Sequence, residues 1–169
     1  IKTIFSDPPT PFSVCIAEQQ SQARGRNGQP YSTPAQCGIW LSMYWQTPQA
    51  LPISTVIALT TRDVLNQLPL THKLTVKWPN DIVYQHNKYA GILVESAYQD
   101  GVHQHIIGVG INIHPSTHPT APHAGAIADL ALSPLNRNHI IAALLDAYQQ
   151  QLATLTQSST DQLPTRWAQ

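Results

Sequence analysis

Short apolar and aromatic runs, separated by polar stretches, recur along most of the chain. Runs of this length, rich in Val, Ile, Tyr and Trp, are typical of β-strands. They predict six strands, over Val14–Glu18, Ile39–Trp45, Leu74–Lys77, Ile82–Tyr84, Tyr89–Tyr98 and Val102–Ile113. The pair Asp100-Gly101 separates the last two runs, and Asp-Gly in that position is a strong signal for a two-residue hairpin turn. We therefore expect those two strands to form one long hairpin.

Two segments show the spacing of apolar residues that a helix requires. Between Ser54 and Leu68 they recur at three- and four-residue intervals, and Ser54 is a suitable N-cap. Between Asn138 and Leu155 the same spacing predicts a longer helix with one apolar face. Strands joined in hairpins, with helices between them, predict an α+β fold: a mixed, largely antiparallel β-sheet with helices packed on one face.

The remaining stretches are polar, rich in Pro, Ser and Thr, and are predicted to be loops or turns. These are Ile1–Ser13, Gln19–Gln36, Pro79–Asp81 and Ser116–Ala126. The second of them is much longer than the usual connection of about 4–6 residues, and connections that long are commonly functional. Its polarity and small residues predict a loop that gains order when a ligand binds.

Charge is sparse and balanced in this chain of 169 residues. Only 11% of the residues are charged, and nine Lys plus Arg offset nine Asp plus Glu. This balance gives no electrostatic basis for binding nucleic acid or an anionic membrane. No apolar run approaches the roughly 18 residues of a membrane span, and no secretory signal pattern is present. We expect a cytoplasmic protein in which Cys15 and Cys37 are free thiols rather than a disulfide.

Some of the few cations lie in short motifs, of which "QARGRNG" (22–28) is the densest. It places Arg24 and Arg26 on either side of Gly25. Glycine allows close approach of the backbone to a ligand and a positive φ, and guanidinium groups bind phosphate or carboxylate. Taken alone, the motif favours a solvated surface turn over a binding loop, because short motifs often match by chance.

Three other motifs are similarly ambiguous one at a time. In "KWPNDI" (77–82), Asp81 either caps a stiff turn or orients a lysine or a metal-bound phosphate. In "NKYAGILVES" (87–96), Lys88 is either a solvated flank or a pocket cation. Gly91 leaves room there for a backbone or ligand. In "GVGINIH" (108–114), alternating glycines leave one face of a strand either open to a flat ligand or closely packed.

In their order and spacing, these motifs resemble the catalytic domain of biotin protein ligases. The stretches that carry the resemblance are "CIAEQQSQARGRNG", "LSMYW", "VKWPNDI", "KYAGILVES" and "IGVGINI", within roughly residues 14–167. Such ligases join biotin to ATP as biotinyl-5′-AMP. They then transfer the biotinyl group to one lysine of the biotin carboxyl carrier protein domain of acetyl-CoA carboxylase. The resemblance implies biotin and ATP as ligands, with Mg²⁺ carried by ATP rather than held in a protein cage.

The resemblance also implies roles for individual residues. Those implied as catalytic are Lys88, Arg26 and Asp81. Those implied to bind biotin are Gln20, Arg24, Gly25, Arg26 and Lys88. Those implied to bind the nucleotide are Arg24, Lys77, Asn80, Asp81 and Asn112. The chain departs from the common family pattern at Ala23, Asn27 and Tyr31, where Gly, Arg and Trp are frequent.

We expect residues 1–169 to be one ligase-like catalytic domain, incomplete at its N-terminus because no Ser-Thr-Asn motif precedes Val14. Neither a helix-turn-helix domain nor a small C-terminal β-barrel is expected, so this chain would bind no nucleic acid. A homodimer stays open, since relatives pair sheet edges near the loop that carries Arg24 and Arg26, and the glycine-rich strand Gly108–Ile113 is compatible with that. Two alternatives also stay open: a lipoyl or octanoyl transferase of the same fold, which needs no ATP, and a non-catalytic biotin-binding or sensor module.

Overall fold

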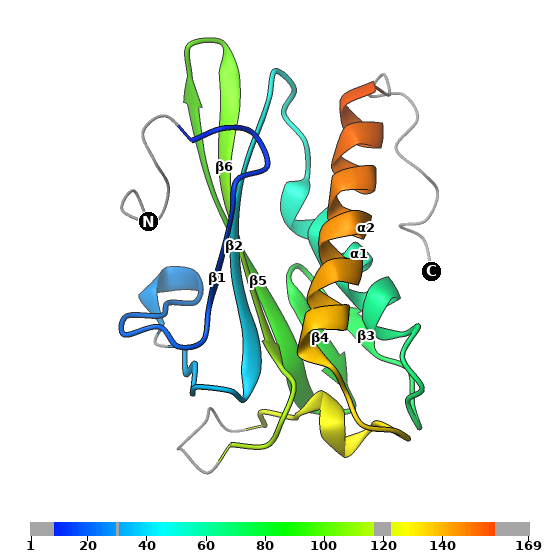
Figure 1. Ribbon diagram of the computed structural model, residues 1–169. Helices are drawn as coiled ribbons and strands as arrows, with labels where there is room; N and C mark the ends of the chain where they lie inside the picture. Colours follow the sequence, from blue (N-terminus) through cyan, green and yellow to red (C-terminus); the bar gives the residue numbers. More distant parts are fainter. Residues whose placement is uncertain (1–8, 30, 117–122, 158–169) are drawn as a thin grey trace.

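A six-stranded antiparallel β-sheet with two helices on one face forms the fold (Figure 1). The computed structural model describes residues 9–29, 31–116 and 123–157. The strand order is β1-β2-β6-β5-β4-β3. The strands are β1 Val14–Ala17, β2 Gly38–Thr47, β3 Thr75–Lys77, β4 Asp81–Tyr84, β5 Asn87–Gln99 and β6 Val102–Asn112. The helices are α1 Ile53–Leu65 and α2 Arg137–Gln157, with short 3₁₀ helices η1 Arg26–Gly28 and η2 Ile127–Asp129. The predicted α+β fold is confirmed.

The long hairpin forms as predicted. Gln99 pairs with Val102, which leaves Asp100-Gly101 as a two-residue turn. Both turn residues have positive φ, 52° and 82°, as the favoured hairpin turn requires. Strand β6 does not offer a free edge, however, because it lies between β2 and β5. The expectation that Gly108–Ile113 could pair with another chain is therefore wrong; the sheet edges are β1 and β3.

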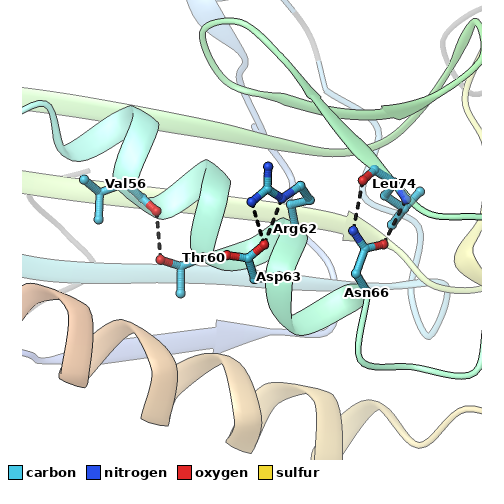
Figure 2. Close-up of polar contacts among 6 residues, drawn as sticks. All are labelled: Val56, Thr60, Arg62, Asp63, Asn66 and Leu74. Carbon is cyan, nitrogen blue, oxygen red and sulfur yellow. Dashed lines mark hydrogen bonds and ion pairs between the residues drawn. The ribbon is translucent and has the colours of Figure 1, made fainter. Parts of the chain in front are cut away.

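Helix α1 begins and ends earlier than its apolar spacing predicts. Its N-cap is Pro52, so Ser54 lies inside the first turn and the expected cap is wrong. The proline ring sets a backbone angle suited to a helix start. The helix ends at Leu65, after which the Asn66 side chain both donates to Leu74 O (3.0 Å) and accepts from Leu74 N (2.8 Å) (Figure 2). This pair of bonds ties the end of α1 to the start of β3.

Alternation along the central strands separates a core face from an open face. Buried residues of β2 and β6 face the helices and are at most 3% exposed: Ile39, Leu41, Met43, Ile107, Val109 and Ile111. Burial of each such side chain is worth roughly 1.5–3 kcal/mol. Across the helix layer, Thr61 of α1 and Tyr148 of α2 share a buried hydrogen bond of 2.7 Å. Burial raises the pKa of Tyr148, so its phenol stays protonated.

Glycines lie at the centre of the opposite face of the sheet. Gly110 pairs with Trp40 on one side and Gly91 on the other, and Gly108 lies two residues away on the same face. We call this surface the glycine face. The loop between β1 and β2 lies on this side of the sheet, away from the helices (Figure 1).

The described residues show free thiols at both cysteines, Cys15 and Cys37, as predicted. Among the described helices, none is long and apolar enough to cross a membrane.

A buried histidine in the half of the β5–β6 hairpin nearer its turn predicts a loss of stability in mild acid. His105 is 4% exposed, and its Nδ1 lies 2.8 Å from Ser96 Oγ. Burial, and to a lesser degree His103, lowers the pKa of His105. In the unfolded chain the His105 imidazole takes up a proton near pH 6.5. In the folded chain it does so only at a lower pH. The contribution of neutral His105 to the free energy of unfolding is thus complete above about pH 6.5 and is lost as the pH falls below that value.

The measurement is the thermal midpoint at pH 7.5 and pH 5.5. We expect the decrease between these pH values to be smaller in His105→Phe than in the wild type. His139→Phe, at an exposed position of α2, is the control and should retain the full decrease. An identical decrease in His105→Phe and the wild type would contradict the prediction.

Candidate active site

A β-bulge decides which way Lys88 points. Along β4 and β5, Asp81 pairs with Gly91 and Ile82 with Ala90, but Val83 pairs with Lys88, so Tyr89 is left over. The extra residue exchanges the two faces of β5 beyond this point. Lys88 consequently lies on the glycine face with Asp81, and Tyr89, 3% exposed, packs into the core. Regular alternation would have buried Lys88 instead.

Lys88 and Asp81, two of the predicted catalytic residues, form an ion pair of 2.7 Å between Nζ and Oδ1. Gly91 makes this geometry accessible, because a Cβ atom there would lie 2.8 Å from Nζ and 2.9 Å from Cε of Lys88. Both charged side chains are partly exposed, at 38% and 27%. Such a pair contributes little to stability, so its main effect is to orient the ammonium group over the glycine face.

Tyr31 closes one side of this arrangement and was not among the predicted site residues. Lys88 Nζ lies 5.8 Å from the centre of the Tyr31 ring, and the ring meets Trp40 edge-on at 6.0 Å. Gly110 provides the space, since a Cβ atom there would approach the Tyr31 ring to 2.9 Å. Burial, with a smaller effect of Asp81, raises the pKa of Tyr31. The protonated phenol donates to Gly110 O at 3.4 Å.

The Asn112 side chain is hydrogen-bonded to the backbone of Lys88. Its Nδ2 donates to Lys88 O (3.4 Å) and Gly125 O (3.2 Å). The segment around Gly125 pairs with the same residue through Lys88 N to His123 O (2.7 Å) and Gly125 N to Lys88 O (2.9 Å). The predicted nucleotide residue Asn112 is thus brought to Lys88, and its amide nitrogen fixes the position of that strand.

The loop between β1 and β2, described over 19–29 and 31–37, is tied to itself and to the glycine face. Tyr31 N donates to Ala23 O (3.1 Å), and Gly25 N donates to Gln29 O (2.7 Å). The Gln20 backbone is held by Thr33, whose Oγ1 accepts from Gln20 N (3.0 Å) and donates to Gln20 O (3.1 Å). We call this segment the arginine loop.

The two arginines of the loop are exposed. Within the described residues no hydrogen bond or ion pair joins Arg24 or Arg26 to another side chain, so both guanidinium groups are available to a ligand. Gly25 has φ of −93°, so it does not supply the positive φ considered from the sequence. Gly28, at 72°, does, and the loop contains the short helix η1 that no sequence pattern predicted.

The last residue of β3 contributes a second cation to the same face. Lys77 pairs with Asp81 across β3 and β4, so the two side chains share a face, and Lys77 is exposed. Beside it Trp78 is 80% exposed. Asn80 is 9% exposed, and its Nδ2 donates to Ile92 O at 2.7 Å. Asn80 therefore braces the turn against β5.

This geometry is suited to binding an anion rather than to nucleophilic attack. Lys88 and Lys77 lie on one open face beside Asp81, and the free guanidinium groups lie on the adjoining loop. Fixed cations of this kind stabilise negative charge that develops in a transition state. Within the described residues, no three His, Cys, Asp or Glu side chains gather as a metal site.

Comparison with known proteins identifies the class to which this fold and site belong. The model of the biotin/lipoate A/B protein ligase family matches residues 2–112. The chain belongs to this family. It is 42% identical over 105 residues to the bifunctional ligase/repressor BirA of Escherichia coli, covering 59% of this chain and 32% of that protein.

A second curated relative matches over a longer stretch. The biotin–[acetyl-CoA-carboxylase] ligase of Mycobacterium tuberculosis is 32% identical over 140 residues, which cover 78% of this chain and 51% of the relative. The chain thus spans about a third to a half of the length of these relatives.

Solved structures confirm the fold. The biotin protein ligase of Aquifex aeolicus in complex with biotin and ATP superposes with a TM-score of 0.76 at 22% identity. The superposition covers 89% of this chain and 64% of that one.

Proposed function

We propose that this chain carries the site of an ATP-dependent biotin ligase. It would activate biotin as biotinyl-5′-AMP and transfer the biotinyl group to a lysine of a biotin carboxyl carrier protein domain. Membership of the family and the names of the curated relatives support this proposal. The single observation that carries it is the Lys88 ammonium, held by Asp81 on a glycine-lined face next to the arginine loop.

The first half-reaction requires two anions to meet. The biotin carboxylate attacks the α-phosphorus of ATP, the bond to the pyrophosphate group breaks, and biotinyl-AMP and pyrophosphate result. Lys88 would lie between the carboxylate and the α-phosphate and offset their repulsion, with Asp81 orienting its ammonium group. Arg24, Gly25 and Arg26 would fold over the acyl phosphate and exclude water from the mixed anhydride, and Gln20 would contact biotin.

The nucleotide side of the proposed site is the turn before β4. Lys77 would reach a phosphate, Asp81 would border the nucleotide, and Asn80 and Asn112 would hold the strands that frame it. A Mg²⁺ ion would arrive with the triphosphate, which supplies oxygen ligands of the kind this ion prefers. It would neutralise phosphate charge. The carrier domain and the cytoplasmic location stay proposals that follow from the same assignment.

The direct test is adenylate formation by the chain. Biotin, MgCl₂ and α-labelled ATP are mixed with the protein, without carrier, and labelled biotinyl-AMP is measured. We expect product that depends on biotin and on ATP. If no adenylate forms, and a separate assay with an octanoylated carrier shows transfer of the octanoyl group without ATP, the family's transferase chemistry replaces this proposal. If biotin binds by calorimetry and no adenylate forms, a binding module replaces it.

A further inference from the structure

The arginine loop is fastened at its base by a residue distant in the sequence. Arg137, the first residue of α2, donates from Nη2 to both carboxylate oxygens of Glu18, at 3.0 and 2.9 Å. From Nη1 it donates to Gly38 O at 3.0 Å. Glu18 immediately follows β1 and Gly38 begins β2. One guanidinium group therefore bridges the two residues that flank the loop.

Packing at the same junction is incomplete. A cavity of about 290 Å³ lies between α2 and the ends of β1 and β2, with Ile16, Ile141 and Leu145 on its walls and Arg137 and Glu18 among its lining residues. Ile16 remains 47% exposed at this point. Since apolar contact between helix and strand is incomplete here, the three hydrogen bonds of Arg137 are the described polar link from α2 to the loop base.

The geometry of this link is specific to arginine. Here Nη2 alone meets both Glu18 oxygens, while Nη1, in the same rigid plane, is directed to Gly38 O. A lysine at the same position has a single point charge and cannot hold both partners in fixed geometry. The ion pair itself is partly exposed, at 25% for Arg137 and 64% for Glu18, so its effect on overall stability is small.

We infer that Arg137 is a positioning residue that holds the arginine loop over the glycine face and so retains the bound adenylate. The adenylate part of this inference rests on the proposed function. The mechanical part does not. The Arg137 clamp, meaning its bonds to Glu18 and Gly38, fixes both ends of the loop that places Tyr31 beside Lys88 and carries the two exposed arginines. Release of the clamp would let the loop open more often while the sheet and the helices stay folded.

The first test is hydrogen exchange of the ligand-free chain, followed in peptides that cover residues 19–29. In Arg137→Ala we expect exchange in these peptides to rise at least about fivefold, with unchanged exchange in β5 and β6. Arg137→Lys should fall between the variant and the wild type. The matched control is Arg62→Ala, because Arg62 forms a comparable ion pair with its neighbour Asp63 on α1 (Figure 2). Unchanged loop exchange in Arg137→Ala, or an equal rise in Arg62→Ala, would overturn the inference.

The second test is the rate at which biotinyl-AMP leaves the protein. In Arg137→Ala we expect release to be about five- to tenfold faster, with the thermal midpoint within about 3 °C of the wild type. Faster release that comes only with a large fall in the midpoint would mean general destabilisation and would count against a positioning role. If the wild type forms no adenylate, the proposed function fails, and the exchange experiment alone still decides whether Arg137 clamps the loop.

Discussion

Lys88→Ala is expected to reduce biotinyl-AMP formation by at least about 10³-fold while the protein stays folded. Loss of one donor that stabilises a developing anion typically costs about 10²–10³-fold, and Lys88 adds a full charge where two anions must approach. Stability should change little because the ion pair with Asp81 is partly exposed. The measurement is single-turnover formation of labelled biotinyl-AMP, with a thermal melt of the same sample.

The control for this variant is Lys73→Ala. Lys73 is exposed ahead of β3, where its ammonium donates to Asn66 O. The Lys73→Ala variant loses the same charge and side chain at a distance from the glycine face and should retain wild-type activity. A Lys88→Ala protein with near-normal adenylate yield would remove Lys88 from the reaction and leave the proposed mechanism without its central cation.

Gly91→Val should be the next most damaging change, although it replaces no charged residue. A Cβ atom at position 91 would lie 2.8 Å from Lys88 Nζ and 3.7 Å from Asp81 Oδ1, so the added methyl groups must displace the ammonium. The displaced atoms are the far end of a flexible side chain, and valine suits a strand. We therefore expect adenylate formation to fall about 10–100-fold, with a change in thermal midpoint of less than about 3 °C.

Glu95→Val is the matched control for this prediction. Position 95 is exposed, lies on the same strand and the same face, and is four residues, or about 13 Å, further along β5. It introduces the same side chain away from Lys88 and should leave activity within about twofold of the wild type. Equal activity of Gly91→Val and Glu95→Val would show that the position of the ammonium is not critical.

Much of the fold could be predicted because it depends on local patterns. Short apolar and aromatic runs located the strands, the three- and four-residue spacing located both helices, and Asp100-Gly101 located the hairpin with its turn. Errors occurred at element ends, where the decisive contacts are with other segments. The residues around Ser54 favoured it as the N-cap, but the N-cap is Pro52. The helix ends at Leu65, where the Asn66 side chain bonds to Leu74.

The site was predictable only in part. The motifs singled out Lys88 and Asp81, and the structure places their charged atoms 2.7 Å apart. Tyr31 was noticed only as a departure from the family pattern, although its ring lies beside the Lys88 ammonium. Its contacts at Gly110 and Trp40 come from strands that its own sequence neighbourhood does not reveal. No signal in the sequence indicated that Arg137 would reach Glu18, 119 positions away.

By itself the sequence determined which residues form strands and helices, where the hairpin turns, and which residue types are available for binding anions. These features follow from side-chain periodicity and turn chemistry, which act over a few residues. Only the tertiary structure decided that a bulge turns Lys88 to the open face and that Gly91 leaves room for its ammonium. It also decided that one guanidinium group joins both ends of the arginine loop. Those outcomes depend on strand register and on contacts between distant segments, which local patterns do not specify.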